Sequence, residues 1–133
     1  AAQWWQMKRL ISFDIDGTLE VGDPPGEITL ATVRLAHDLG IVIGSCSDRP
    51  VGVQQALWAK HDIPMRFTVL KQNLMDVRES FDVDHYMHTG DSPIDEQMAR
   101  EAEFEFLDSL QDAEPRLREL LTSDWAGSEA ASD

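Results

Sequence analysis

The sequence of 133 residues is poor in cysteine, in lysine and in long apolar runs. Its one cysteine cannot form a disulfide within the chain, so nothing indicates an oxidising compartment. No apolar run approaches the roughly 20 residues that a membrane-spanning helix needs, and no apolar segment typical of a signal peptide opens the chain. These absences favour a cytoplasmic protein without a membrane partner.

Positive charge is also scarce. Lysine and arginine together number 11, against 25 aspartates and glutamates, which leaves a formal net charge of -14. A protein that binds nucleic acid through a broad basic face needs the opposite balance, so nucleic acid is not favoured as a partner. The acid excess is also one way to stay hydrated in high salt, and a salt-adapted source is a hypothesis that this composition raises.

What the chain does contain is enough apolar material for one hydrophobic core. Hydrophobic residues make up 42% of the sequence, and the length suits a single domain. Met7 has the character of an initiator, so we interpret residues 1–7 as an N-terminal extension. We assign residues 8–121 to one folded domain and interpret residues 122–133 as a flexible acidic tail.

Short apolar runs alternate with segments of helical periodicity. The runs predict strands at 10–13, 41–47, 67–70, 85–89 and 104–107, and the periodicity predicts helices at 28–39, 53–61, 74–80, 94–102 and 113–121. Strands joined by helical crossovers form parallel sheets covered on both faces. We therefore predict an α/β fold with a doubly wound, Rossmann-like sheet of five parallel strands.

Polar residues follow four of these strands, at the edge where parallel sheets bind ligands. Asp14 and Asp16 follow the first strand, Ser47 ends the second, Lys71 follows the third and Asp91 follows the fourth. Carboxylates, a hydroxyl and an ammonium at one edge are what phosphoryl transfer needs. A bare Asp-x-Asp-Gly also occurs as a turn, so the pair alone does not decide between turn and catalyst.

The longer pattern resembles the haloacid dehalogenase-like (HAD) phosphohydrolases. Residues 13–19 (FDIDGTL) look like the first motif of that family, and residues 41–50 (IVIGSCSDRP) look like the second. Lys71 after FTVL is similar to the lysine of the third motif, and residues 90–95 (GDSPID) are similar to the fourth. The four motifs occur in the family's order over about residues 8–121.

The resemblance implies a magnesium-dependent phosphatase that hydrolyses a phosphomonoester. Asp14 would be the nucleophile that forms an aspartyl-phosphate, and Asp16 would be the general acid and then the base. Ser47 and Lys71 would bind the phosphoryl group, with Thr18 assisting by positioning Asp16. Mg²⁺ would be held by Asp14, by the backbone carbonyl of Asp16 and by Asp91, and Asp95 would support the site.

Several alternatives stay open in the sequence. Ser45 competes with Ser47 as the hydroxyl of the second motif, and Asp95 could serve only as a carboxylate in the first turn of a helix. A receiver-like phospho-acceptor domain or a catalytically silent scaffold could use the same kind of fold. The identity of the phosphorylated substrate does not follow from these residues.

The chain has no room for the cap domain that many HAD enzymes insert beside the site. Only a short loop separates Leu19 from the first predicted helix, and one helix and one strand fill the stretch between Ser47 and Lys71. We therefore expect a capless member. Its open site would then be closed by a neighbouring subunit in a homo-oligomer or by a large substrate.

Overall fold

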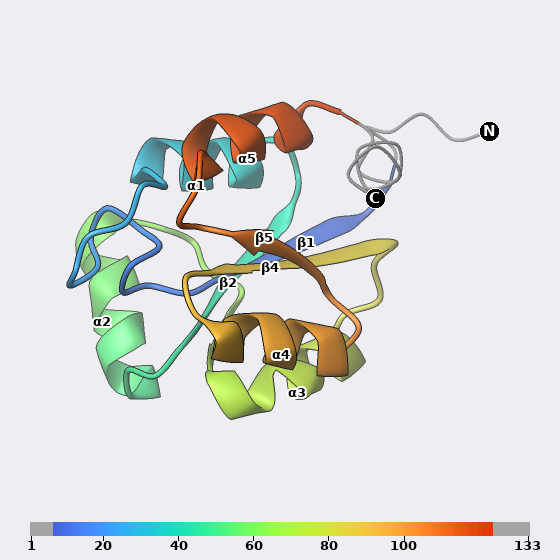
Figure 1. Ribbon diagram of the computed structural model, residues 1–133, viewed down its shortest axis with the longest axis horizontal. Coiled ribbons are helices and arrows are strands. Elements are labelled where there is room, and N and C mark those ends of the chain that lie inside the picture. The colour runs from blue at the N-terminus through green and yellow to red at the C-terminus, as the bar shows by residue number, and fades with distance from the viewer. Residues whose placement is uncertain (1–6, 124–133) are drawn as a thin grey trace.

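The computed structural model describes residues 7–123, and these form an α/β fold (Figure 1). Five strands make one sheet: β1 (Arg9–Phe13), β2 (Val42–Ser47), β3 (Phe67–Leu70), β4 (His85–Gly90) and β5 (Glu105–Asp108). Between and after them come α1 (Leu30–Asp38), α2 (Val51–His61), α3 (Leu74–Ser80), α4 (Pro93–Glu101) and α5 (Ala113–Leu121), with a short 3-10 turn, η2 (Lys71–Asn73), before α3.

The sheet is entirely parallel, with the strand order β3-β2-β1-β4-β5. β1 is buried along its whole length and pairs with β2 on one side and β4 on the other. The chain moves outward from β1 to β3 and then crosses to β4, so the direction of winding reverses beside β1. The prediction of a Rossmann-like sheet of five parallel strands is confirmed.

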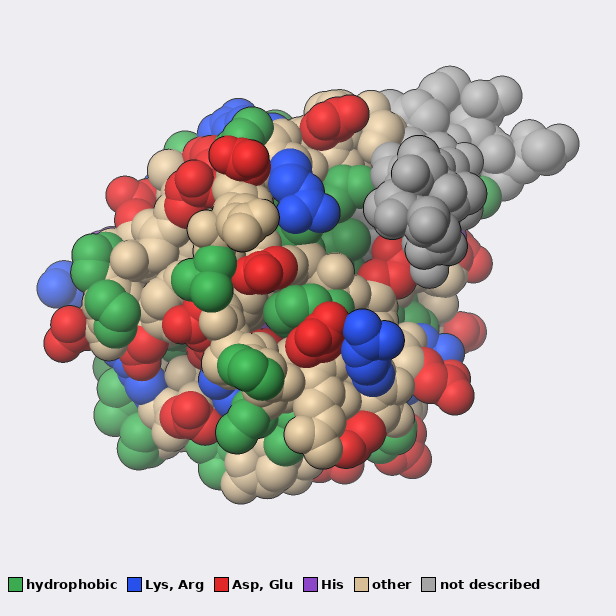
Figure 2. Space-filling view, in the orientation of Figure 1, with side chains coloured by type: hydrophobic (Ala, Val, Ile, Leu, Met, Phe, Trp, Pro, Cys, Tyr) green, Lys and Arg blue, Asp and Glu red, His purple; other side chains and the backbone are tan. Residues whose placement is uncertain are grey.

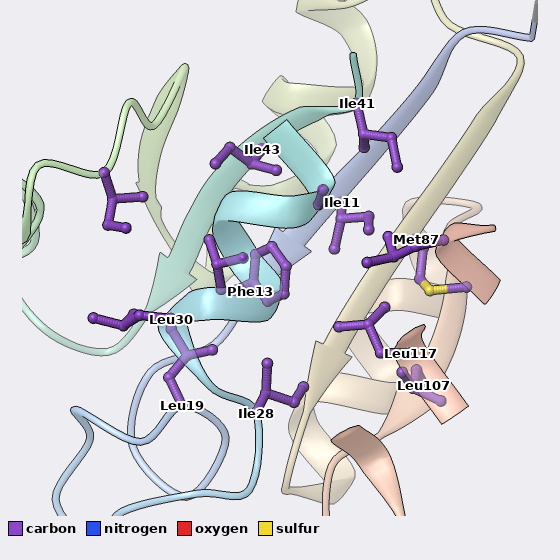
Figure 3. Close-up of a cluster of buried hydrophobic side chains, with 14 of the residues drawn as sticks. Ile11, Phe13, Leu19, Ile28, Leu30, Ile41, Ile43, Met87, Leu107 and Leu117 are labelled. Atoms are coloured by element: carbon purple, nitrogen blue, oxygen red, sulfur yellow. The ribbon is translucent and has the colours of Figure 1, made fainter. Parts of the chain in front are cut away.

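Helices cover both faces of the sheet, as Figure 1 shows, with α1 and α5 on one side and α3 and α4 on the other. Alternate residues of β1 supply the two cores, because successive side chains of a strand point to opposite faces. Ile11 and Phe13 join the core under α1 and α5, which Figure 3 shows. Leu10 joins the second core, with residues of α3 and α4. Trp58 of α2 packs into the first core.

Three helices differ from the prediction by one or two residues at their ends. α1 spans Leu30–Asp38 rather than residues 28–39, and α4 ends at Glu101 rather than at residue 102. α4 begins at Pro93 rather than Ile94, because Ser92 caps its first turn and proline suits a first helical position that needs no N–H donor. α2 begins at Val51 rather than at residue 53, directly after Pro50. All of these differences lie at helix ends, where periodicity carries the least information.

The connection from β1 to α1 is a compact loop. Leu19 and Ile28 form an isolated parallel bridge across it, and both side chains are fully buried. Asp23 and Pro24, at the far end of the loop, are joined by a cis peptide bond. The carboxyl ends of all five strands open toward this loop, so residues at the strand ends gather beside it.

The predicted N-terminal extension (1–7) lies outside the described residues except for Met7, and the predicted tail (122–133) does so beyond Ser123. Within residues 7–123, no helix is both long and apolar enough to cross a membrane. The face shown in Figure 2 carries acidic side chains over most of its extent, with basic side chains few and separated.

Arg9 ties the first strand to the end of the last helix. Its side chain is buried and donates to the carbonyl oxygens of Leu120, Leu121 and Ser123 at distances of 3.3, 3.1 and 3.4 Å. The last carbonyls of a helix have no partner within the helix. A buried guanidinium therefore supplies the donors that the end of α5 lacks.

We predict that Arg9→Met lowers the free energy of unfolding by roughly 2–4 kcal/mol, because buried carbonyls would lose charge-assisted hydrogen bonds. Urea unfolding followed by circular dichroism measures the change. The matched control is Arg100→Met, which removes an exposed i,i+4 pair with Glu96 and should cost no more than about 0.5 kcal/mol. Equal effects of the two substitutions would contradict the role given to Arg9.

Candidate functional site

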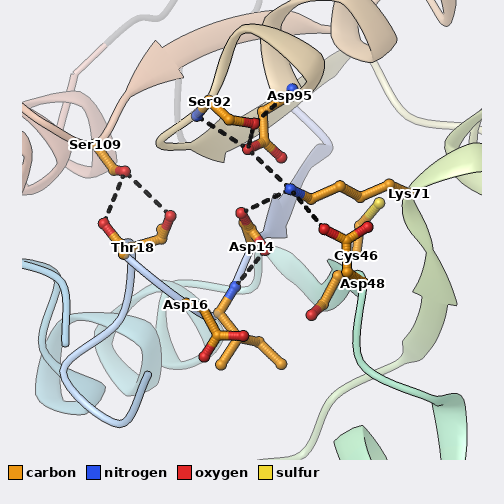
Figure 4. Close-up of polar contacts among 12 residues, drawn as sticks. Asp14, Asp16, Thr18, Cys46, Asp48, Lys71, Ser92, Asp95 and Ser109 are labelled. Atoms are coloured by element: carbon orange, nitrogen blue, oxygen red, sulfur yellow. Dashed lines mark hydrogen bonds and ion pairs between the residues drawn. The ribbon is translucent and has the colours of Figure 1, made fainter. Parts of the chain in front are cut away.

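The carboxyl ends of the strands bring polar side chains together at one edge of the sheet. Asp14 follows β1, Asp48 follows β2, Lys71 follows β3, Asp91 follows β4 and Ser109 follows β5. Figure 4 shows the side chains of Asp14, Asp48 and Lys71 meeting there. The convergence arises from the parallel topology, because every strand of a parallel sheet ends at the same edge.

Asp14 lies at the centre of this group and is 3% exposed. Its backbone N–H donates to the carbonyl of Thr89 on β4, at 2.9 Å, which extends the pairing of the two central strands by one residue. One carboxylate oxygen accepts from the N–H of Ile15 at 2.7 Å. The other lies 3.2 Å from the Lys71 ammonium. The side chain therefore has a defined orientation.

Lys71 is surrounded by carboxylates. Its ammonium lies 3.2 Å from Asp14, 3.2 Å from Asp95 and 3.6 Å from Asp48. Burial alone would lower the pKa of Lys71, but the charges of Asp14 and Asp95 outweigh it and raise that pKa above its ordinary value. The ammonium therefore stays protonated, and both buried carboxylates lie in contact with it.

One lysine cannot fully compensate two buried carboxylates. Burial, together with the nearby charge of Asp95, raises the pKa of Asp14 to about 8, although Lys71 acts in the opposite direction. For Asp95, burial alone would raise the pKa, but hydrogen bonds from His88 and Ser92 and the charge of Lys71 together hold it below its ordinary value. Of the two carboxyl groups, Asp14 is therefore the more easily protonated and Asp95 the less.

Asp95 is held by a dense set of donors at the start of α4. Ser92 and Asp95 form a reciprocal capping box. The Nε2 atom of His88 lies 2.8 Å from one Asp95 oxygen, and the other oxygen accepts from Lys71 at 3.2 Å and from the Ser92 hydroxyl at 2.8 Å. A Cβ at position 90 would overlap the Asp95 carboxylate, so Gly90 permits this close approach.

His88 is a site residue that the sequence reasoning missed. It is 1% exposed, and its Nδ1 lies 2.9 Å from the hydroxyl of Ser12 on β1. The only signal in the sequence is a histidine within an otherwise buried strand. The tertiary fold was needed to show that this imidazole faces Asp95 across the start of α4.

A group of three carboxylates could hold a metal ion. Within residues 7–123, Asp14, Asp91 and Asp95 each offer one oxygen, and these atoms all lie within 4.8 Å of one another. Asp91 has no hydrogen bond or ion pair among the described residues and lies against Gly17, where φ is +75° and a Cβ would overlap its carboxylate. An all-oxygen set of this kind suits a hard divalent cation.

The structure brings the predicted ligands Asp14 and Asp91 together with Asp95, but it places the Asp16 carboxylate apart from them. Arg49 binds Asp16 with two donors: Nη2 is 2.6 Å from one oxygen and Nε is 3.2 Å from the other. The N–H of Asp23 also donates to Asp16 at 2.7 Å. The hydrogen bond with Arg49 is the main reason why the pKa of Asp16 lies below its ordinary value.

The two candidate serines of β2 occupy different environments. Ser45 is fully buried, donates to Gln54 at 2.6 Å and accepts from the Trp58 indole at 2.8 Å. Ser47 ends the strand, and its hydroxyl accepts from the N–H of Arg49 at 3.0 Å. The Ser45 hydroxyl is therefore committed to packing α2 on the sheet, whereas Ser47 lies at the edge that carries Asp14.

Thr18 is not part of the group around Lys71. It is fully buried, and its hydroxyl lies 3.1 Å from the hydroxyl of Ser109, which also donates to the carbonyl of Gly17 at 3.3 Å. These bonds join the loop after β1 to the end of β5 (Figure 4). Thr18 thus helps to set the path of the loop that carries Asp16.

Arg49 was also missed as a site residue by the sequence reasoning. It stands two residues after Ser47, in a segment that the sequence predicted only as part of the second motif and its turn. Its pairing with Asp16 joins residues 33 positions apart. No pattern among neighbouring residues predicts a pair between positions so far apart in the sequence.

A comparison with models of known protein families found no match. A search of curated proteins found no significant match either.

The raised pKa of Asp14 predicts a pH dependence of stability. In the folded, metal-free protein, burial and the charge of Asp95 raise the pKa of Asp14 to about 8, whereas an aspartate in the unfolded chain has a pKa of 3.8. The stabilisation from this difference is complete below pH 3.8 and is lost as pH rises through 8.

Thermal unfolding in EDTA measures this effect. From pH 6 to pH 9 the midpoint of the wild type should fall more steeply than that of Asp14→Asn, which has no proton to lose at this position. Parallel profiles of the two proteins would contradict the assignment of the proton to Asp14. A saturating divalent cation should flatten the wild-type profile, because binding replaces that proton.

We also predict that His88→Leu destabilises the fold by roughly 2–4 kcal/mol, because the buried Asp95 carboxylate would lose a hydrogen bond that nothing replaces. His88→Gln keeps a donor and should cost less. Urea unfolding measures both variants, with His37→Leu on the exposed end of α1 as the control. Equal losses for leucine and glutamine would argue that packing, rather than the hydrogen bond, explains the effect.

Proposed function

We propose that this chain is a magnesium-dependent phosphatase of the capless HAD type, which hydrolyses a phosphomonoester through an aspartyl-phosphate on Asp14. One observation carries the proposal. The Asp14 carboxylate at the end of the central strand lies 3.2 Å from a buried lysine and within 4.8 Å of the Asp91 and Asp95 oxygens. The four motifs that resemble the family supply these residues, and the sheet order brings them to one edge.

The donor set is compatible with the metal that the proposal requires. Asp14 and Asp91 would hold Mg²⁺ with the backbone carbonyl of Asp16, while Asp95 keeps its bonds to His88 and Lys71. Few carboxylates with room for water are what magnesium prefers. When bound, it would supply positive charge that allows Asp14 to be ionised and polarises the phosphoryl oxygens.

In the proposed reaction, Asp14 acts as the nucleophile and Asp16 acts first as the acid and then as the base. The ionised Asp14 attacks phosphorus, a bond forms between its carboxylate oxygen and phosphorus, and the bond from phosphorus to the ester oxygen breaks. Asp16 gives a proton to that departing oxygen, which leaves as an alcohol. In the second step water attacks the phosphorus, Asp16 takes back a proton from it, and inorganic phosphate and free Asp14 are formed.

Lys71 and Ser47 are the proposed phosphoryl-binding groups. The ammonium of Lys71 already lies beside Asp14, so it can neutralise charge on the attacking carboxylate and on the phosphoryl oxygens. Ser47 lies at the end of the neighbouring strand with its hydroxyl still able to donate, because the bond from the Arg49 N–H uses only its oxygen. Thr18 contributes by fixing the loop that carries Asp16.

The proposal includes an uncapped site. The loop from β1 to α1 is closed by the Leu19–Ile28 bridge, and α2 alone connects β2 with β3. Neither connection leaves room for an inserted domain. We propose a cytoplasmic enzyme whose open cleft is covered by a second copy of the chain or by a large phosphorylated substrate.

The nucleophile is tested with Asp14→Asn on p-nitrophenyl phosphate in the presence of magnesium. Turnover should fall by about 10³-fold or more, because the attacking group itself is removed, and only the wild type should gain the mass of one phosphoryl group when quenched during turnover. Asp38→Asn, an exposed acid at the end of α1, is the matched control and should be unaffected. Undiminished turnover of Asp14→Asn would overturn the proposal.

The same assay separates the alternatives. A catalytically silent scaffold predicts no turnover by the wild type on any phosphomonoester. A receiver-like domain predicts labelling by acetyl phosphate at a residue other than Asp14, and here the third strand is followed by Lys71 rather than by an acid. Turnover that persists in excess EDTA would contradict the metal part of the proposal alone.

A further inference from the structure

Arg49 is the second cation at the carboxyl edge of the sheet, and its position differs from that of Lys71. Lys71 is buried among three carboxylates, whereas the Arg49 side chain is 24% exposed and pairs with Asp16, which is itself 36% exposed. Both side chains of this pair reach solvent, so a second anion can approach the guanidinium and compete with Asp16 for it. The Arg49 guanidinium is therefore available to an incoming anion.

The backbone of Arg49 is anchored by contacts that do not involve its side chain. The N–H of Arg49 donates to the Ser47 hydroxyl at 3.0 Å, and its carbonyl accepts from the Gln54 amide at 2.8 Å. Gln54 is fully buried and also donates to the carbonyl of Val69 at 3.1 Å. A change of partner thus requires only rotation of the Arg49 side chain, without movement of β2 or α2.

The pair with Arg49 conflicts with the role proposed for Asp16. One Asp16 oxygen accepts from Arg49 and from the N–H of Asp23, and the other accepts from the Nε of Arg49. The guanidinium that binds both oxygens stabilises the ionised form of Asp16 and lowers its pKa, so Asp16 does not readily hold a proton for an ester oxygen while this pair persists. Catalysis by Asp16 therefore requires Arg49 to leave it for another partner.

That partner can be located from the same geometry, if the proposed function is accepted. The phosphoryl group already meets Lys71 and the bound cation, whereas Asp16 serves the oxygen of the leaving group. Arg49 lies against Asp16, so an anion that replaces Asp16 in the fork of Arg49 belongs to the leaving group. A planar guanidinium with two parallel donors matches a carboxylate or a phosphate.

We propose that Arg49 recognises a second anionic group on the leaving-group side of the substrate, and that binding this group releases Asp16 for proton transfer. The substrate class is then a phosphomonoester whose alcohol carries a carboxylate or a further phosphate near the ester oxygen. This inference rests on the proposed function and names the substrate class of the same site.

The test compares esters that differ in the second anion alone. For the carboxylate, 3-phosphoglycerate is paired with glycerol 3-phosphate; for the phosphate, glucose 1,6-bisphosphate is paired with glucose 6-phosphate. The quantity measured is the ratio of kcat/KM within each pair, for the wild type, Arg49→Lys and Arg49→Gln. Arg34→Gln, which removes an arginine bound to the His61 carbonyl, controls for the change in net charge. Thermal melts check that each variant is folded.

In the wild type, at least one of the two ratios should exceed about ten, which corresponds to one good charge-assisted pair. The pair with the larger ratio identifies the second anion as carboxylate or phosphate. Arg49→Gln should bring that ratio close to one, Arg49→Lys should keep part of it, and Arg34→Gln should keep all of it.

Three results would overturn the inference. Ratios near one in the wild type, with clear turnover of p-nitrophenyl phosphate, would refute the inference and leave the proposed function intact. An equal loss of kcat/KM on both members of each pair in Arg49→Gln would mean that Arg49 binds the transferred phosphoryl group instead. Absence of turnover on every ester would refute the proposed function and this inference with it.

Discussion

The ammonium of Lys71 between Asp14 and Asp95 is the interaction on which the candidate site depends. One oxygen of each carboxylate is 3.2 Å from the Nζ atom. Asp14 directly follows β1, Lys71 lies in η2 after β3, and Asp95 lies in α4. A buried charge is stable only when it is paired. The lysine therefore holds the end of the central strand close to the start of α4. It also holds its own segment after β3 against both of them.

The pKa values of Asp14 and Asp95 shift in opposite directions because the two carboxyl groups share Lys71 but differ in their other donors. Asp95 has additional donors in His88 and Ser92 and stays ionised. Asp14 has one backbone donor besides Lys71, and burial together with the charge of Asp95 raises its pKa to about 8. A divalent cation beside Asp91 would favour the ionised form of Asp14, so in the proposed mechanism binding of the cation would also activate the proposed nucleophile.

Much of the fold could be predicted because its signals are local. Apolar runs of strand length and helical periodicity are properties of neighbouring residues, and the five strands and five helices were located from them. The edge that gathers Asp14, Ser47, Lys71 and Asp91 also followed, because all strands of a parallel sheet end on one side. The errors were confined to helix and strand ends.

The sequence by itself determined which chemical groups reach the edge of the sheet, since a residue's place relative to its own strand is a local property. Only the tertiary structure decided which groups are partners. Arg49 pairs with Asp16 across 33 positions, and His88 meets Asp95 through the packing of α4 on β4. Likewise Ser45 is committed to Trp58 in the core while Ser47 remains at the edge. Such choices depend on side-chain packing between elements distant in sequence, where burial makes each unsatisfied polar atom costly.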